Sequence, residues 1–287
     1  MSGISTARTI SIPVAGAPLL EVEHLRVEFP TSQGTATVVH DASFRVEQGE
    51  TLGIVGESGS GKSMTSLAVM GLLPRGGRAT GSARLFGHEL LGRSDRDLRR
   101  IRGDRIAMVF QDPLSSLNPY YTVGLQITEA YRAHRGGSRA AARKVAIDAL
   151  ERVRITDPER RVDQYPHQFS GGMRQRIMIA MAICLEPDLI ICDEPTTALD
   201  VTVQAQILDL LADLQRETGT GMIFITHDLA VVSRVADDVL VMRDGAEVER
   251  GTTEQVFTAP RAPYTRSLLD ALPRIDDPFE TLKGVAR

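Results

Sequence analysis

The chain has 287 residues, of which 42% are hydrophobic and 24% charged, as in an ordinary globular protein with one large or two modest domains. A formal net charge of −4 argues against a nucleic-acid-binding protein, which usually carries a basic excess. The N-terminus lacks the features of a signal peptide, and the longest strongly apolar stretch, Ile177 to Leu185, is too short to span a bilayer. We therefore expect a cytosolic protein. Such a protein could serve a membrane only through a partner.

The first third of the chain predicts strands followed by a loop and a helix. Residues 1–18 are rich in Ser, Thr, Ala and Pro without periodicity, which predicts a flexible tail. Alternating β-branched and polar residues from Leu19 to Glu47 predict strands around a turn at Gly34. A buried strand from Glu50 to Gly56 then leads through a glycine-rich loop into an apolar helix over about Lys62 to Leu73.

The remainder predicts a helical middle and an alternating end. Residues 120–186 have helical periodicity, and Ser138 can cap a helix that runs to about Arg154. Beyond them we expect buried parallel strands and amphipathic helices, the strands at Leu189–Cys192 and Met222–Thr226 and the helices at Val201–Thr218 and after Asp228. Together the elements predict an α/β fold with an N-terminal β region and an inserted α-helical subdomain.

A glycine-rich loop between the predicted strand and helix has the chemistry of a phosphate cradle. It matches G-x-x-x-x-G-K-[ST] with Gly56, Glu57, Ser58, Gly59, Ser60, Gly61, Lys62 and Ser63. Glycines let successive N–H groups point at a polyphosphate, the Lys62 ammonium would contact the β- and γ-phosphates, and the Ser63 hydroxyl would bind Mg²⁺. A chance match is disfavoured because the chain has only three lysines, Lys62, Lys144 and Lys283. A nucleoside triphosphate site therefore follows, but the loop alone does not name the function, because kinases, GTPases and motors share it.

Two carboxylates end a later apolar strand. Asp193 and Glu194 follow Leu189-Ile-Ile-Cys192. An aspartate at such a strand end can hold Mg²⁺ beside a P-loop, and the adjacent glutamate can orient and deprotonate the attacking water. An acidic turn after a core strand would be the simpler interpretation if this segment stood alone.

A second glycine-rich loop precedes a predicted helix. In Phe169-Ser-Gly-Gly-Met-Arg-Gln-Arg176, Ser170 is a suitable N-cap, and Gly171 and Gly172 leave backbone amides uncovered. This would be a second anion site in a chain that already has one. The segment resembles the signature loop of ABC ATPases, a family in which the loop of one subunit closes on ATP held by the P-loop of the other.

The resemblance implies roles for four further residues. Gln111, after the predicted strand Ile106–Phe110, resembles the Q-loop glutamine that senses Mg²⁺ and links to the membrane subunits. Ala198-Leu-Asp200 resembles the D-loop, so Asp200 would lie at the dimer interface, and His227 resembles the switch histidine that contacts the γ-phosphate. Phe29 is the candidate aromatic for stacking on adenine. The resemblance covers about residues 19–273 with its motifs intact, which implies an active ATP hydrolase.

Three segments resemble one branch of the family, the bacterial importers of oligopeptides, dipeptides and nickel. They are Gln111-Asp-Pro-Leu-Ser-Ser-Leu-Asn-Pro119, the stretch from Asp193 to Gln206, and Ala262-Pro-Tyr-Thr-Arg-Ser-Leu-Leu269. The branch implies a peripheral location on the cytoplasmic face of the inner membrane, two transmembrane permease subunits and an extracytoplasmic solute-binding protein. Met173, where many signature loops have glutamine, resembles the first of two distinct ATPase chains, so a heterodimer is expected. Nickel or another non-peptide solute is the alternative cargo.

The resemblance also sets the expected domains. They are a tail over 1–18, an ABC ATPase domain over 19–259 with the helical subdomain at about 120–186, and a short C-terminal tail over 260–287. A soluble, non-transport ABC ATPase is a further alternative. The arginine-rich segment Arg93–Arg105 could suggest a DNA-repair role, but Asp95, Asp97 and Asp104 are interleaved with its arginines. This pattern predicts a solvated, salt-bridged face. No nucleic-acid partner is therefore expected.

The cysteines bear on a cofactor that some relatives carry. Cys184 and Cys192 are the only cysteines, and both lie in apolar stretches, which predicts buried thiols in a reducing compartment. Several members of the branch continue into a cysteine-containing extension that in some cases binds an iron–sulfur cluster. Because such a cluster usually needs four thiolates, none is expected here.

Overall fold

The structure is a computed structural model that describes residues 14, 16–197 and 199–271. The predicted tail over 1–18 therefore lies largely outside the described residues, as do Ala198 of the predicted D-loop and residues 272–287 of the predicted C-terminal tail.

The described strands form one sheet whose order is β5-β4-β1-β2-β10-β9-β3-β8-β7-β6. Five neighbours pair in parallel, namely β3 (Thr51–Val55), β6 (Ile106–Val109), β7 (Leu189–Asp193), β8 (Gly221–Thr226) and β9 (Asp238–Arg243). Four others pair antiparallel, namely β1 (Leu20–Thr31), β2 (Gly34–Val46), β4 (Arg78–Leu85) and β5 (His88–Glu89). The strand β10 (Ala246–Thr252) runs antiparallel to β9 and joins β2 through one parallel pair, Ala246 with Asp41.

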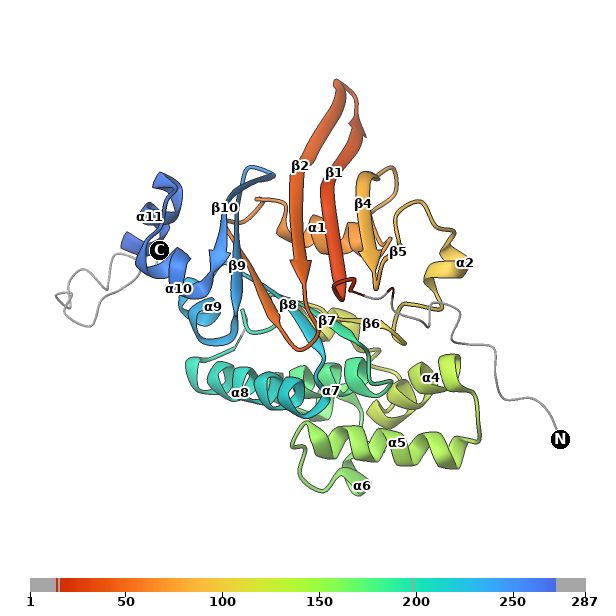
Figure 1. Ribbon diagram of the computed structural model, residues 1–287. Coiled ribbons are helices and arrows are strands. Elements are labelled where there is room, and N and C mark those ends of the chain that lie inside the picture. Colours follow the sequence, from red (N-terminus) through yellow and green to blue (C-terminus); the bar gives the residue numbers. More distant parts are fainter. Residues whose placement is uncertain (1–13, 15, 198, 272–287) are drawn as a thin grey trace.

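Helices between β6 and β7 form a separate layer, which Figure 1 shows on the side of the parallel strands away from the tips of β1 and β2. They are α3 (Pro113–Ser116), α4 (Val123–Arg135), α5 (Arg139–Arg152), α6 (Pro158–Arg161) and α7 (Gly171–Ile183), with a 3₁₀ turn at Pro166–Gln168. The predicted cap is confirmed, because the Ser138 hydroxyl accepts a hydrogen bond from the N–H of Ala141 at 3.2 Å. The predicted α/β fold with an antiparallel β subdomain and an inserted helical subdomain is thus confirmed.

The other described helices lie before β6 or after β7 in the chain. They are α1 (Lys62–Val69), α2 (Asp95–Leu98), α8 (Val201–Thr218), α9 (Leu229–Val235), α10 (Thr253–Thr258) and α11 (Pro263–Asp270). Buried apolar side chains form three clusters, under α7 and α8, under α1 and the antiparallel strands, and under α9 to α11. The third cluster joins Tyr264 of α11 to Val55 of β3, so α11 packs against the parallel part of the sheet.

The structure also contains strands that the sequence analysis did not identify, namely β4, β5, β9 and β10. The arginine-rich segment is salt-bridged as predicted at Asp95, which pairs with Arg99 and Arg102, each at 2.8 Å. Asp104 departs from the prediction of a solvated face, because it is buried and pairs with Arg135 of α4 at 2.8 Å.

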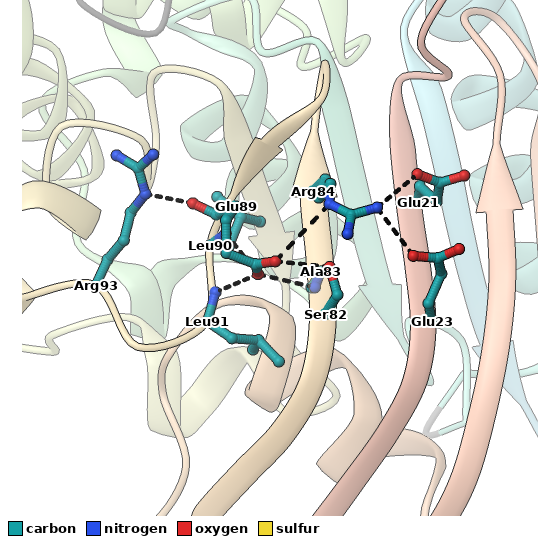
Figure 2. A network of polar contacts seen from close by, with 9 residues as sticks. All are labelled: Glu21, Glu23, Ser82, Ala83, Arg84, Glu89, Leu90, Leu91 and Arg93. Atoms are coloured by element: carbon teal, nitrogen blue, oxygen red, sulfur yellow. Dashed lines mark hydrogen bonds and ion pairs between the residues drawn. The ribbon is translucent and has the colours of Figure 1, made fainter.

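A network of polar contacts links β5, β4 and β1 at one edge of the sheet (Figure 2). The Glu89 carboxylate accepts hydrogen bonds from the Ser82 hydroxyl at 2.6 Å and from the N–H groups of Ala83, Leu90 and Leu91 at 2.9–3.0 Å. Burial opposes its charge, but these four hydrogen bonds outweigh burial and hold the pKa of Glu89 below its ordinary value. The network therefore locks the short strand β5 onto β4.

Both thiols are free and buried, as predicted. Burial raises the pKa of Cys184 to about 11 and raises that of Cys192 further, so both stay protonated. Among the helices in the described part of the chain, none has the length and apolar character needed to cross a membrane.

Candidate ATP-hydrolysis site

The glycine-rich loop joins the end of β3 to the start of α1, where the sequence placed it. Gly56, Gly59 and Gly61 have φ values of +154°, +82° and +95°. A side chain at Gly56 would collide with the carbonyl oxygen of Met242, and a Cβ at Gly61 would lie 2.8 Å from that of Val38. Glycine is therefore required at both positions by backbone conformation and by close packing.

The Lys62 side chain is folded into this loop. It is 4% exposed, and its ammonium donates hydrogen bonds to the carbonyl oxygens of Gly56 and Glu57, both at 2.7 Å, and to Ser60 Oγ at 3.3 Å. Burial lowers the pKa of Lys62, while the nearby carboxylates of Glu194 and Asp193 oppose that shift. The loop thus holds a partly desolvated cation where a polyphosphate would enter.

The carboxyl ends of β6, β7 and β8 lie beside the loop because these strands run parallel to β3. Ligands of open α/β sheets bind at this edge. Here the Ser63 hydroxyl donates to Asp193 Oδ1 at 2.8 Å. Burial raises the pKa of Asp193, with the Glu194 charge adding to that effect and the Ser63 hydrogen bond and the Lys62 charge opposing it. The P-loop hydroxyl and the strand-end carboxylate are therefore in direct contact.

Glu194 is the point where the other predicted side chains meet. Its Oε2 accepts a hydrogen bond from the Gln111 amide at 3.1 Å and one from the Thr197 hydroxyl at 2.9 Å, and it lies 3.4 Å from Nδ1 of His227. The Glu194 side chain is 17% exposed. Its φ of +46° is left-handed, a conformation that costs a non-glycine residue about 1–3 kcal/mol. Strained residues of this kind cluster at active sites.

A cavity of about 700 Å³ lies among these groups, although Asp193 and Thr197 are not among the residues that line it. Its walls include the whole loop from Gly56 to Ser63, together with Gln111, Glu194 and His227. The sequence analysis did not identify Val38, Leu229 and Leu268, which also line the cavity, or Thr197, which orients Glu194. A cavity of this size with a cationic loop at one wall and a carboxylate at another suits a nucleoside polyphosphate.

The signature loop lies elsewhere on the surface. Ser170 caps α7 by accepting a hydrogen bond from the Met173 N–H at 3.4 Å, and Asp200 caps α8 by accepting one from the Val203 N–H at 3.0 Å. Neither Ser170 nor Asp200, nor the glycines Gly171 and Gly172, are among the residues that line the cavity. The side chain of Phe29 is not among them either; its ring packs beside Gly77, where an added Cβ would lie 2.7 Å from it.

The sequence model described as ABC transporter matches residues 39–197, more than half of the chain. This chain belongs to the ABC transporter family. A second model, described as the C-terminal region of oligopeptide/dipeptide transporters, matches residues 248–287.

Named relatives and solved structures of the ABC family agree with this assignment. The chain is 50% identical over 265 residues to the oligopeptide transport ATP-binding protein OppD of Haemophilus influenzae, covering 92% of this chain and 82% of that protein. It is 51% identical over 268 residues to the dipeptide transport ATP-binding protein DppD of Escherichia coli, covering 93% and 82%. A dimeric bacterial ABC transporter cassette superposes with a TM-score of 0.72 at 27% identity, covering 82% of this chain and 98% of that chain. A post-hydrolysis cassette bound to ADP and Pi gives the same TM-score at 26% identity, with the same coverage.

Proposed function

We propose that the chain binds ATP with Mg²⁺ and hydrolyses it as the motor subunit of a bacterial ABC importer of di- or oligopeptides. The observation that carries the proposal is the meeting of Gln111 and His227 at one oxygen of Glu194, in the same cavity as Lys62. The names of the relatives, which are oligopeptide and dipeptide transport ATP-binding proteins, support peptides as the solute.

The residues of the cavity fit a magnesium nucleotide. Ser63 and Gln111, which line the cavity, and Asp193, which contacts Ser63, offer hydroxyl, amide and carboxylate oxygens, the hard ligands that Mg²⁺ prefers. When bound, Mg²⁺ would neutralise charge on the β- and γ-phosphates. Lys62 and the loop amides hold the phosphates, with Ser58 and Ser60 among the loop residues. Phe29 remains the proposed contact of the adenine, although its ring lies outside the cavity lining.

Glu194 is proposed as the general base. Its Oε2 is held by Gln111 and Thr197, and a carboxylate so oriented can take a proton from the attacking water. His227 would contact the transferring phosphoryl group from the neighbouring strand end. The hydrolysis step breaks the bond between the β–γ bridging oxygen and the γ-phosphorus, with water oxygen as the new ligand of phosphorus, and yields ADP and phosphate.

The signature loop and the D-loop are proposed to complete the site of a second ATPase subunit. Ser170, Gly171, Gly172 and Asp200 lie outside this chain's own cavity, as a site built between two subunits requires. Met173 supports a heterodimer with a similar but distinct chain. The proposed complex has two transmembrane permease subunits and an extracytoplasmic solute-binding protein, with this chain peripheral on the cytoplasmic face of the inner membrane.

We propose the domain limits expected from the sequence, with an ATPase domain over 19–259 and a helical subdomain at about 120–186. The helices α4 to α7 fall within that range and support it. The segment from 260 onward is proposed as the importer-type tail, but its helix α11 shares a buried cluster with β3.

Affinity purification of the tagged chain from detergent-solubilised native membranes tests the transport assignment. We expect mass spectrometry to find a second ATPase chain, two polytopic membrane proteins and, after mild cross-linking, a solute-binding protein. A parallel purification from an untagged strain is the control. Recovery of only soluble or nucleic-acid-bound partners would overturn the transport assignment while leaving the ATPase chemistry intact.

A further inference from the structure

The C-terminal helix α11 lies against the start of the P-loop, although more than 200 residues separate them in sequence. The N–H of Glu57 donates a hydrogen bond to the Tyr264 hydroxyl at 3.4 Å. Four residues further along α11, one helical turn away, Leu268 lines the cavity that holds the P-loop. Figure 1 shows α11 next to β10, at the C-terminal end of the described residues.

Tyr264 is held from both sides. Its side chain is 8% exposed and belongs to the cluster that includes Val55, the last residue of the strand leading into the P-loop. The Arg243 guanidinium lies over the Tyr264 ring at 4.8 Å from its centroid. Burial raises the pKa of the Tyr264 phenol, so its hydroxyl keeps its proton. These contacts therefore hold the Tyr264 hydroxyl in a fixed position beside the loop.

The helix itself is anchored to β10 by a carboxylate. Glu249 is 9% exposed, and its two oxygens accept hydrogen bonds from the N–H groups of Arg261 at 2.7 Å and Ala262 at 3.0 Å. At the same end of the helix, the Arg266 guanidinium donates to the carbonyl oxygens of Pro260 and Arg261, both at 3.0 Å. Glu249 therefore ties the two residues that precede α11, one of them its N-cap Ala262, to β10.

From these contacts we infer that α11 is a positioning element of the nucleotide site. Tyr264 is the positioning residue, and it holds the start of the P-loop at Glu57. The P-loop binds phosphate through backbone N–H groups whose directions must be set before the nucleotide arrives, and a loop fixed at Glu57 loses less conformational freedom on binding. The inference rests on the proposed ATP site. It gives the segment matched by the C-terminal transporter model a role at that site, since α11 falls inside residues 248–287.

The first test measures the loop directly by hydrogen–deuterium exchange of the full-length, nucleotide-free chain. Tyr264→Phe removes only the hydroxyl and keeps the ring on which Arg243 stacks. We expect faster exchange in the peptide that contains Glu57. Ser267→Ala is the matched control, because the Ser267 hydroxyl donates only to the Tyr264 carbonyl oxygen at 2.7 Å, within α11. This control should leave the P-loop peptide unchanged.

The second test titrates the same proteins with Mg·ATP by calorimetry. Loss of one neutral hydrogen bond predicts roughly two- to fivefold weaker ATP binding by Tyr264→Phe. Ser267→Ala should bind like the wild type, and Glu249→Gln, which loosens the anchor of α11, should weaken binding in the same direction as Tyr264→Phe. In the assembled transporter the Tyr264→Phe effect should appear in KM for ATP and leave kcat within about twofold.

The outcomes separate the two proposals. Wild-type protein that binds no Mg·ATP would overturn the ATP site and, with it, this inference. Wild-type binding with unchanged exchange and affinity in Tyr264→Phe would overturn the inference alone. Equal losses of affinity and of nucleotide-free melting temperature in Tyr264→Phe and Ser267→Ala would show general destabilisation of α11 and would also overturn it.

Discussion

Replacing Glu194 by glutamine should leave ATP binding intact and lower the rate of ATP hydrolysis by about 10²–10⁴-fold, the usual loss when a general base is removed. The amide keeps the shape of the side chain, so Gln111 and Thr197 retain a partner at this position, but it cannot accept the proton of the attacking water. With hydrolysis blocked, the ATP-bound subunits should accumulate as a closed dimer. Phosphate release by the assembled transporter and size-exclusion chromatography with ATP measure the two effects.

Glu186→Gln is a matched control for that substitution. Glu186 also has a left-handed backbone, with φ of +54°, but it is not among the residues that line the nucleotide cavity. Its amide variant should hydrolyse ATP at the wild-type rate. Wild-type turnover by Glu194→Gln would instead remove Glu194 from the mechanism and leave the base to be found elsewhere.

Lys62→Ala should weaken ATP binding by roughly ten- to a hundredfold. Hydrogen bonds to charged groups contribute about 1.5–3 kcal/mol each, and Lys62 is the cation enclosed by the loop. Calorimetric titration with Mg·ATP measures the loss. Because Lys62 also donates hydrogen bonds to two loop carbonyl oxygens, its loss could destabilise the loop, and the melting temperature of each variant is measured alongside.

Lys144→Ala provides the control for Lys62→Ala, since Lys144 is an exposed lysine on α5. It should bind Mg·ATP as tightly as the wild type. If both lysine variants bound as tightly as the wild type, the phosphate role of Lys62 would be wrong even though the loop has the right shape.

The parts of the site that the sequence could predict are those encoded locally. The P-loop lies between a buried strand and a helix, and its three glycines with positive φ, Gly56, Gly59 and Gly61, are within six residues of Lys62. Asp193, Glu194 and His227 follow apolar strands, and parallel strands end at a common edge, so their meeting could be expected from chain order.

Other contacts depend on packing between distant segments and could not be predicted in this way. Tyr264 reaches Glu57 only because β9 and β10 bring the C-terminal helix beside β3, and neither strand was identified in advance. β10 is a short strand with three charged residues among its seven, which masks the alternation that marks a strand. The adenine contact of Phe29 stays a prediction: its ring packs beside Gly77 and is not among the residues that line the cavity.

Peptide uptake by living cells tests the central claim most directly. The gene for this chain is deleted and replaced by the wild type, by Glu194→Gln or by Glu186→Gln, and uptake of a radiolabelled dipeptide, a radiolabelled tetrapeptide and nickel is followed. We expect deletion and Glu194→Gln to abolish uptake of at least one peptide, wild type and Glu186→Gln to restore it, and nickel uptake to stay unchanged. Peptide uptake that is equal in all four strains would contradict the assignment to peptide import. Loss of nickel uptake alone would support an ATPase subunit of a nickel importer and would show that peptides are not the solute.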